Sequence, residues 1–226
     1  MPATAVARSI PPVREGVLLW FCVLAALAVS RVIPFPGLTG ALAVALFLWA
    51  PQRLLEKRGQ DAHDAGWRFD KLRADVSWAL GTSLVVVPVF ALAFFQFPAW
   101  LALLPQPLRL LLAPYAGGVS LHPPRFTWDL FGQIAGNGAV AFSEEFFYRG
   151  YLTLRFEERY SPIRAAVFAA ALFALGHLLT PAPFRLLVFF PALLFAFLRN
   201  RTHTIVGAAI THWIFNVALL LLQASS

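Results

Sequence analysis

The chain has 226 residues, of which 59% are hydrophobic and only 13% are charged. This composition and a mean hydropathy of +0.70 are typical of a membrane protein and exclude an ordinary soluble domain. The net charge of +7 does not indicate nucleic-acid binding, because the basic residues are scattered between hydrophobic runs. Cys22 is the only cysteine, which excludes an intrachain disulfide, a CxxC redox pair and a thiolate metal site.

The apolar runs predict an all-α fold, a polytopic transmembrane helical bundle of about seven spans, with six to eight as the range. Each run is long enough, or nearly so, to cross a hydrocarbon core. The seven runs are 16–33, 38–54, 76–98, 128–150, 162–180, 184–199 and 203–222. We expect a charged soluble loop from Arg53 to Asp75 and a proline-rich loop from Pro98 to Pro124.

Lysine and arginine placement predicts the orientation of this bundle. With the N-terminus in the cytoplasm, fourteen of the 18 basic residues fall on the inner side. The four on the outer side are Arg31, Arg109, Arg125 and Arg185. This bias agrees with the positive-inside rule. Together with a composition rich in Ala, Leu and Arg and with compact loops, it predicts an integral protein of the bacterial inner membrane.

The fourth run contains Glu144 and Glu145, followed by Arg149 and a glycine. A charged side chain at membrane depth costs at least ~2.5–3.5 kcal/mol, so such residues usually mark a functional site. Glu145 and Arg149 are four residues apart in the favourable order for an ion pair. The alternative is a solvated helix end that carries an ion pair.

Three further polar residues, His177, His212 and Asn216, are expected at a similar depth. Ser161 and Pro162 are typical of a helix start, so the fourth and fifth runs form an antiparallel pair that turns near 160–161. Glu144 and His177 are each 16 positions from that turn, about 24 Å along a helix. In the seventh run, His212 and Asn216 lie four residues apart on one helix face and reach a similar depth. Taken singly, each of these residues has a packing role as its alternative.

These residues carry a resemblance to a known family. Glu144-Glu145-x-x-x-Arg149, Phe173-x-x-x-His177 and His212-x-x-x-Asn216 resemble, in order, the three motifs of the CAAX-processing and bacteriocin-processing (CPBP) intramembrane glutamic endopeptidases. The resemblance covers the region from about Trp128 to Leu222. It divides the chain into N-terminal transmembrane helices and loops, 1–127, and a catalytic helical core, 128–222, within one integral membrane domain.

The resemblance implies that water, activated by the protein, hydrolyses a peptide bond of a membrane protein or peptide. Glu144 would act as general base and His177 would hold and polarise the water. His212 and Asn216 would donate hydrogen bonds to the developing oxyanion. Glu145 and Arg149 would form a supporting pair, and Phe173 would pack beneath the site. No cofactor is expected, no nucleic acid is expected as a partner, and the sequence does not indicate an oligomeric state.

Three alternatives remain at this point. One glutamate and two histidines could ligate zinc, which would make the protein a zinc-dependent membrane hydrolase. An acidic residue at membrane depth also fits a proton-coupled transporter, although no inverted repeat is visible. The third alternative is a non-catalytic membrane scaffold. A serine or cysteine nucleophile with a neighbouring base, and the HExxH, GxGD and GxSG signatures, are absent from the sequence.

Overall fold

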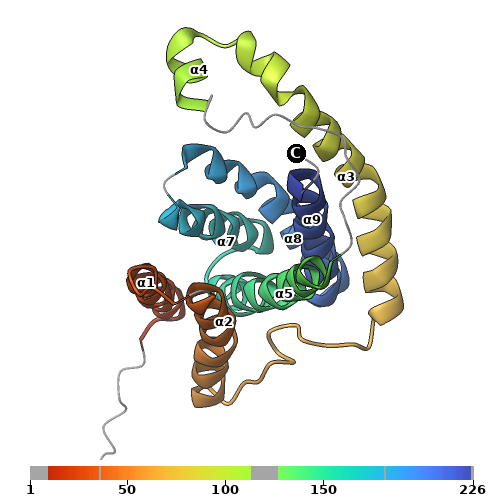
Figure 1. Ribbon diagram of the computed structural model, residues 1–226. Coiled ribbons are helices and arrows are strands. Elements are labelled where there is room, and N and C mark those ends of the chain that lie inside the picture. The colour runs from red at the N-terminus through yellow and green to blue at the C-terminus, as the bar shows by residue number, and fades with distance from the viewer. Residues whose placement is uncertain (1–9, 36, 113–126, 181, 225–226) are drawn as a thin grey trace, which may run out of the picture.

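The computed structural model of the protein describes residues 10–35, 37–112, 127–180 and 182–224 (Figure 1). The described residues form helices, most of them joined by short connections, with a longer connection at 58–71 between α2 and α3, and no strand occurs among them. The elements in chain order are α1 (Pro12–Ser30), α2 (Leu38–Lys57), α3 (Leu72–Ala102), α4 (Gln106–Leu112), α5 (Trp128–Glu145), the π-helix η2 (Phe146–Leu152), α6 (Thr153–Glu157), α7 (Pro162–Gly176), the 3₁₀-helices η3 (His177–Leu179) and η4 (Pro183–Val188), α8 (Phe189–Thr202) and α9 (Val206–Ala224).

The predicted all-α membrane bundle is confirmed. Among the described residues, α1, α2, α3 and the stretch Pro162–Leu179 are long and apolar enough to cross a membrane, by length and composition. Val206–Leu222 is a shorter apolar helix. Every one of the seven predicted runs overlaps a helical segment. Large hydrophobic side chains such as Leu84 and Val89 on α3 are exposed, as expected for a surface that faces lipid.

The proline-rich segment from Pro98 to Pro124 is not a loop throughout, as the sequence analysis expected. Helix α3 continues to Ala102, and α4 occupies Gln106–Leu112; residues 113–126 lie outside the described residues. Prolines are compatible with these helices for two reasons. Pro107 lies in the first turn of α4, where no backbone N–H is needed, and membrane helices tolerate internal prolines such as Pro98 of α3.

The end of the predicted loop Arg53 to Asp75 is also helical, because α3 begins at Leu72. Asp75 is fully buried in the first turn of α3, and its Oδ1 accepts a hydrogen bond of 2.6 Å from the Thr204 hydroxyl. Thr204 lies just before α9, and the backbone of Asp75 approaches Gly207 so closely that a Cβ there would lie 3.2 Å from the Asp75 carbonyl oxygen. Helix α3 is therefore fixed to the start of α9, alongside which it runs in Figure 1.

The C-terminal helices form the centre of the bundle. Helix α9 packs against α3, α5 and α8, and α7 packs against α8 (Figure 1). Helices α1 and α2 pack against each other, and α2 also packs against α5 and η2. The shared core is rich in aromatic side chains, among them Phe47 of α2, Phe147 of η2 and Phe173 of α7. The N-terminal helices thus brace the helix that carries the two adjacent glutamates.

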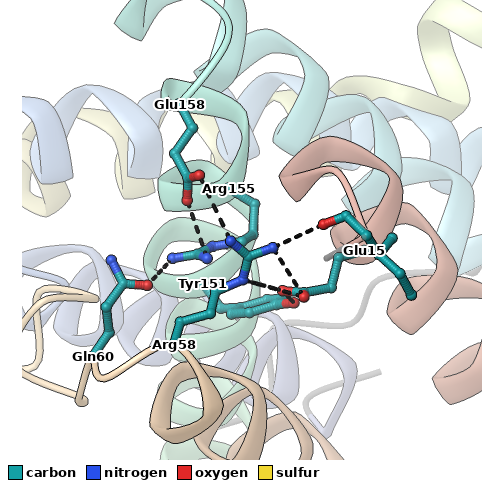
Figure 2. A network of polar contacts seen from close by, with 7 residues as sticks. Glu15, Arg58, Gln60, Tyr151, Arg155 and Glu158 are labelled. Carbon is teal, nitrogen blue, oxygen red and sulfur yellow. Dashed lines mark hydrogen bonds and ion pairs between the residues drawn. The ribbon is translucent and has the colours of Figure 1, made fainter. Parts of the chain in front are cut away.

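A polar network joins the start of α1 to η2 and α6, the segments that follow the two glutamates (Figure 2). The Glu15 carboxylate accepts hydrogen bonds from Arg58 at 3.1–3.2 Å and from the Tyr151 hydroxyl at 3.0 Å. The buried Arg155 donates to Gln60 and forms an ion pair of 3.1 Å with Glu158. Partial burial alone would lower the pKa of Arg58, but the hydrogen bond and the negative charge of Glu15 raise the pKa above its ordinary value.

Candidate active site

The helix that carries the paired glutamates changes its winding directly after them. Helix α5 ends at Glu145 and continues without a break into η2, a seven-residue π-helix. The Thr153 hydroxyl donates a 2.8 Å hydrogen bond to the Tyr148 carbonyl oxygen at the end of the wider turn. π-helical segments are rare and often occur at functional sites. No periodicity in the sequence distinguishes this segment from an α-helix.

Gly150 explains one feature of the motif. A Cβ at this position would lie 2.8 Å from the carbonyl oxygen of Ala65, in the segment that follows α2. Real Cβ atoms do not approach a backbone oxygen that closely, so any larger residue must displace one of the two segments. The glycine after Arg149 therefore allows residues from the N-terminal region to pack directly on the π-helix.

Glu145, Arg149 and His212 form a buried triad. Glu145 Oε1 accepts a hydrogen bond of 3.0 Å from Arg149 Nη1 and lies 2.8 Å from His212 Nδ1. Because an ionised carboxylate only accepts hydrogen bonds, Nδ1 of His212 carries the hydrogen in this contact. The carboxylate thereby fixes the tautomer and orientation of the imidazole, whose Nε2 faces the opposite way. Sequence spacing predicted the Glu145–Arg149 pair, and the structure confirms it.

The pair is buried and does not lie at a solvated helix end, which was the alternative that the sequence left open. The side chains of Glu145 and Arg149 are 0% and 1% exposed. Protein groups contact the Arg149 guanidinium: its Nη2 donates to the Ala192 carbonyl oxygen at 3.0 Å, and its central carbon lies 4.6 Å from the centre of the Phe173 ring and 5.3 Å from that of the Phe195 ring. A hydrogen-bonded acceptor and two aromatic faces lower the cost of burying the charge.

Phe195 of α8 is a site residue that the sequence analysis missed. Its ring stacks on the His212 imidazole, with centroids 4.8 Å apart and an angle of 18° between the planes. The Arg149 guanidinium also lies over this ring, so Phe195 contacts both His212 and Arg149. Phe195 stands in an apolar run with no polar neighbour, and no pattern in the sequence distinguishes it from ordinary core residues.

Glu144 is more accessible than its neighbour. Its side chain is 17% exposed, and its Oε2 lies 3.6 Å from His212 Nε2. His212 therefore lies between the two glutamates, with Nδ1 on the buried carboxylate and Nε2 towards the accessible one. Consecutive residues on a helix point about 100° apart, which is why two adjacent glutamates meet the same imidazole from different sides and differ in exposure.

His177 lies at the C-terminal end of α7, where the helix passes into η3. Its Nδ1 lies 2.9 Å from the Phe173 carbonyl oxygen, which can only accept, so Nδ1 carries the hydrogen, and in the neutral ring Nε2 is left with a lone pair. The Phe173 ring contacts both imidazoles, with centroid distances of 4.5 Å to His177 and 5.8 Å to His212. The imidazole within ion-pair distance of Glu144 is that of His212 and not, among the described residues, that of His177.

Asn216 lies one turn beyond His212 on α9 and is half-buried. Within the described part of the chain, its side-chain amide makes no hydrogen bond with another protein group. The structure thus brings Glu144, Glu145, Arg149, Phe173, His177 and His212 into one connected cluster, and it places Asn216 beside that cluster without joining it.

The geometry also bears on where a metal could bind. Of the described residues, Asp61, His63 and Asp64 bring three ligand-type atoms within 4.8 Å of one another, and all three are exposed. Asp61 and Asp64 accept hydrogen bonds from each other's backbone N–H groups in this turn. Glu144, His177 and His212 do not form such a group within the same described residues.

Comparison with known proteins covers the same region as the motifs. Residues 126–218 match the model of the family described as "Type II CAAX prenyl endopeptidase Rce1-like", which belongs to the CPBP family. No curated protein and no solved structure matches the chain. The matched region contains all seven residues that the sequence analysis selected.

Proposed function

We propose that this membrane protein is an endopeptidase that hydrolyses a peptide bond of a membrane-associated, lipidated or sorted protein or peptide. The family match supports a CAAX protease-type peptidase. The observation that carries the proposal is the position of His212, which is 2.8 Å from one glutamate and 3.6 Å from the other. One imidazole held by a buried carboxylate and facing an accessible one is a recurrent arrangement for acid–base chemistry.

In the proposed reaction Glu144 acts as general base. It takes a proton from a water molecule, and the water oxygen attacks the carbonyl carbon of the scissile bond. The C–N bond of the tetrahedral intermediate then breaks, and the proton passes from Glu144 to the leaving amine. The 17% exposure of Glu144 supports this role, because the base must reach both water and substrate. Glu145 has no such access and is bound by Arg149 and His212.

The two histidines and Asn216 take supporting parts in the proposed reaction. His177 accepts a hydrogen bond from the attacking water at Nε2, since its Nδ1 hydrogen is held by the Phe173 carbonyl oxygen. His212, in its imidazolium form, donates from Nε2 to the developing oxyanion while Nδ1 remains on Glu145. The Asn216 amide, which makes no hydrogen bond within the described part of the chain, supplies a second donor. Removing one oxyanion donor typically costs roughly 10²–10³ in rate.

A zinc-dependent hydrolase is the second candidate. The same two hydrogen bonds favour it, whereas Glu144, His177 and His212 do not bring three ligand-type atoms within 4.8 Å of one another among the described residues. Metal-ligating histidines usually donate the hydrogen of their other ring nitrogen to a carboxylate or a backbone carbonyl, as His212 and His177 do here. The two candidates differ in their response to metal removal. If the water-only mechanism holds, treatment with a strong zinc chelator leaves cleavage unchanged; loss of activity that zinc restores would favour the metal mechanism.

The substrate is found most directly by affinity capture from membranes with a Glu144→Gln variant. This substitution keeps the size of the side chain, so substrates are bound and not turned over. The captured peptides are then sequenced and offered to the wild-type protein in water enriched in ¹⁸O. Cleavage that places one ¹⁸O atom in the new carboxyl terminus supports the proposal. Captured peptides that wild-type protein leaves intact would instead favour a scaffold that binds membrane proteins without cleaving them.

The proposed location and orientation follow from charge. We place the protein in a bacterial inner membrane with the N-terminus in the cytoplasm. The helix ends that carry most of the basic residues then face the cytoplasm, as the positive-inside rule requires.

A further inference from the structure

The surface of α3 carries a hollow away from the proposed active site. It has a volume of about 390 Å³ and is lined by Ser77, Trp78, Gly81 and Thr82. A Cβ built on Gly81 meets no atom within 4 Å, so the space over this glycine is empty. Helix α3 lies at the outer edge of the bundle in Figure 1, beside α8 and α9. The hollow therefore faces the surroundings of the protein and not its core.

Helix α8 contacts Trp78, one of the residues that line the hollow. The Phe197 ring of α8 meets the Trp78 ring edge-on, with centroids 6.1 Å apart. Arg201, one helical turn after Phe197, places its guanidinium carbon 5.4 Å from the Trp78 ring centroid. Because residues four apart share a helix face, Phe197 and Arg201 both face Trp78. Arg73 lies one turn before Ser77 on α3 and is exposed, so a second cation lies on the same face of α3 as the hollow.

The charge of Arg201 is not neutralised within the described part of the chain. Its neighbour on α8, Arg199, pairs with Glu157, and Arg58, Arg149 and Arg155 also have carboxylate partners. No carboxylate of the described residues lies within ion-pair distance of Arg201. An exposed arginine stacked on a tryptophan at the end of membrane helices is positioned for an anionic group at the membrane surface.

An apolar strip leads away from the two arginines along α3. Gly81, Val85, Val89 and Leu92 follow one another at three- or four-residue steps and so lie on one face of the helix. Val85, Val89 and Leu92 are each at least 60% exposed. From Gly81 to Leu92 the strip extends about 17 Å at 1.5 Å per residue. A cationic end, two hydroxyl groups and a long apolar strip match the three parts of a phospholipid: phosphate, glycerol region and acyl chain.

We propose that the hollow and the apolar strip of α3, with Arg73 and Arg201 at one end, form a groove that binds an anionic phospholipid. Arg201 and Arg73 contact the phosphate and headgroup, the hydroxyls of Ser77 and Thr82 face the glycerol esters, and one acyl chain lies over Gly81 and along the strip. This site is separate from the Rce1-like reaction, because its α3 residues precede the matched region and none of its residues belongs to the Glu144–His212 cluster.

The chain contains a matched control for this proposal. Arg53 stacks on Trp49 of α2 at 5.8 Å, a second exposed arginine–tryptophan pair near the end of a membrane helix. Arg53, however, forms an ion pair of 3.2 Å with Glu56, and the hollow on α3 lies elsewhere. If lipid binding needs only a surface cation and a tryptophan, the two pairs are equivalent. If it needs the groove and a free charge, only the Arg201 pair binds the lipid.

The test measures lipid binding to the full-length protein in detergent by native mass spectrometry. Phosphatidylglycerol and phosphatidylcholine are titrated separately against wild type, Arg201→Ala, Arg53→Ala and Gly81→Leu, and size-exclusion profiles verify folding. We expect wild type to prefer phosphatidylglycerol and Arg201→Ala to lose about fivefold in affinity for it, the effect of one basic residue near a membrane surface. Arg53→Ala stays within about twofold of wild type, and Gly81→Leu weakens both lipids by filling the groove.

Three results would overturn the proposal. Equal affinities of wild type for the two lipids would remove the anionic preference. Equal losses in Arg201→Ala and Arg53→Ala would assign the binding to general surface charge. Unchanged binding in Gly81→Leu would show that the groove is not occupied, and this variant decides the matter even if Arg201→Ala fails to fold, since a side chain at position 81 meets open space.

Discussion

Removing one partner of the buried ion pair between Glu145 and Arg149 should destabilise the protein strongly. Both side chains are essentially unexposed, and they contact each other at 3.0 Å. Removing one partner leaves the other as an uncompensated buried charge, which typically costs 3–5 kcal/mol. We therefore expect Glu145→Leu and Arg149→Met each to destabilise the protein by about 3–5 kcal/mol. For a chain of this size, that corresponds to roughly 6–20 °C in melting temperature.

The double variant separates this explanation from simple loss of packing. When both charges are replaced by apolar side chains of similar size, the buried pair no longer needs compensation, and such replacements are often neutral or stabilising. Here Nδ1 of His212 also loses its acceptor, and an unsatisfied buried donor costs about 1–3 kcal/mol. The double variant should therefore lose about 1–3 kcal/mol, far less than the sum of the two single variants.

The assay is thermal unfolding of the purified protein in detergent, followed by tryptophan fluorescence and by the monodisperse fraction that remains after heating. The exposed pair Arg53–Glu56 is the control, with side chains 60% and 47% exposed. Breaking an exposed pair costs about 0–1 kcal/mol. Single variants of the buried pair that lose no more stability than this control, or effects that add in the double variant, would contradict a large cost of the uncompensated buried charge.

Two further predictions concern the fold. Gly150→Ala should destabilise the protein by about 1–3 kcal/mol, because the new Cβ would lie 2.8 Å from the Ala65 carbonyl oxygen. As the control, Gly81→Ala, whose Cβ meets open space, should be neutral or stabilising by up to about 1 kcal/mol. Equal melting temperatures for the two variants would contradict this prediction. Single cysteines at Lys57 and Val32, in a protein without its natural cysteine, should react with a membrane-impermeant maleimide from opposite sides of the membrane. Labelling of both from one side would show that α2 does not cross the membrane.

The helices could be predicted from the sequence because the membrane imposes a simple rule. A segment that crosses lipid must be apolar and must satisfy its own backbone, so hydrophobic runs predict helices directly. The rule says nothing about segments that do not cross lipid. Pro107 in the first turn of α4 and Asp75 in the first turn of α3 therefore lie in helices where loops were expected. Both segments are polar or proline-rich in sequence, which suggested a loop. Each is compatible with a helix because the residue lies in the first turn, where backbone N–H groups have no partner within the helix.

The active-site cluster was only partly predictable for a similar reason. Ionisable residues in apolar runs are conspicuous, and the i, i+4 spacing of Glu145 and Arg149 predicted their pairing. Helix lengths placed Glu144, His177 and His212 at a similar depth, but they did not predict that the Glu144 carboxylate lies 3.6 Å from His212. The π-helix after Glu145 and the stacking of Phe195 on His212 arise from packing between helices, which leaves no periodic signal in the sequence.

The central claim is that Glu144 activates water for peptide hydrolysis in a cluster centred on His212. The most direct measurement compares cleavage rates of wild type and Glu144→Gln, both reconstituted in liposomes in metal-free buffer with a peptide captured by the variant. We predict that wild type cleaves the peptide without added metal and that Glu144→Gln is slower by roughly 10²–10⁴-fold, with an unchanged melting temperature. A variant that cleaves at a rate close to that of wild type, or a wild type that cleaves only after zinc is added, would contradict the account.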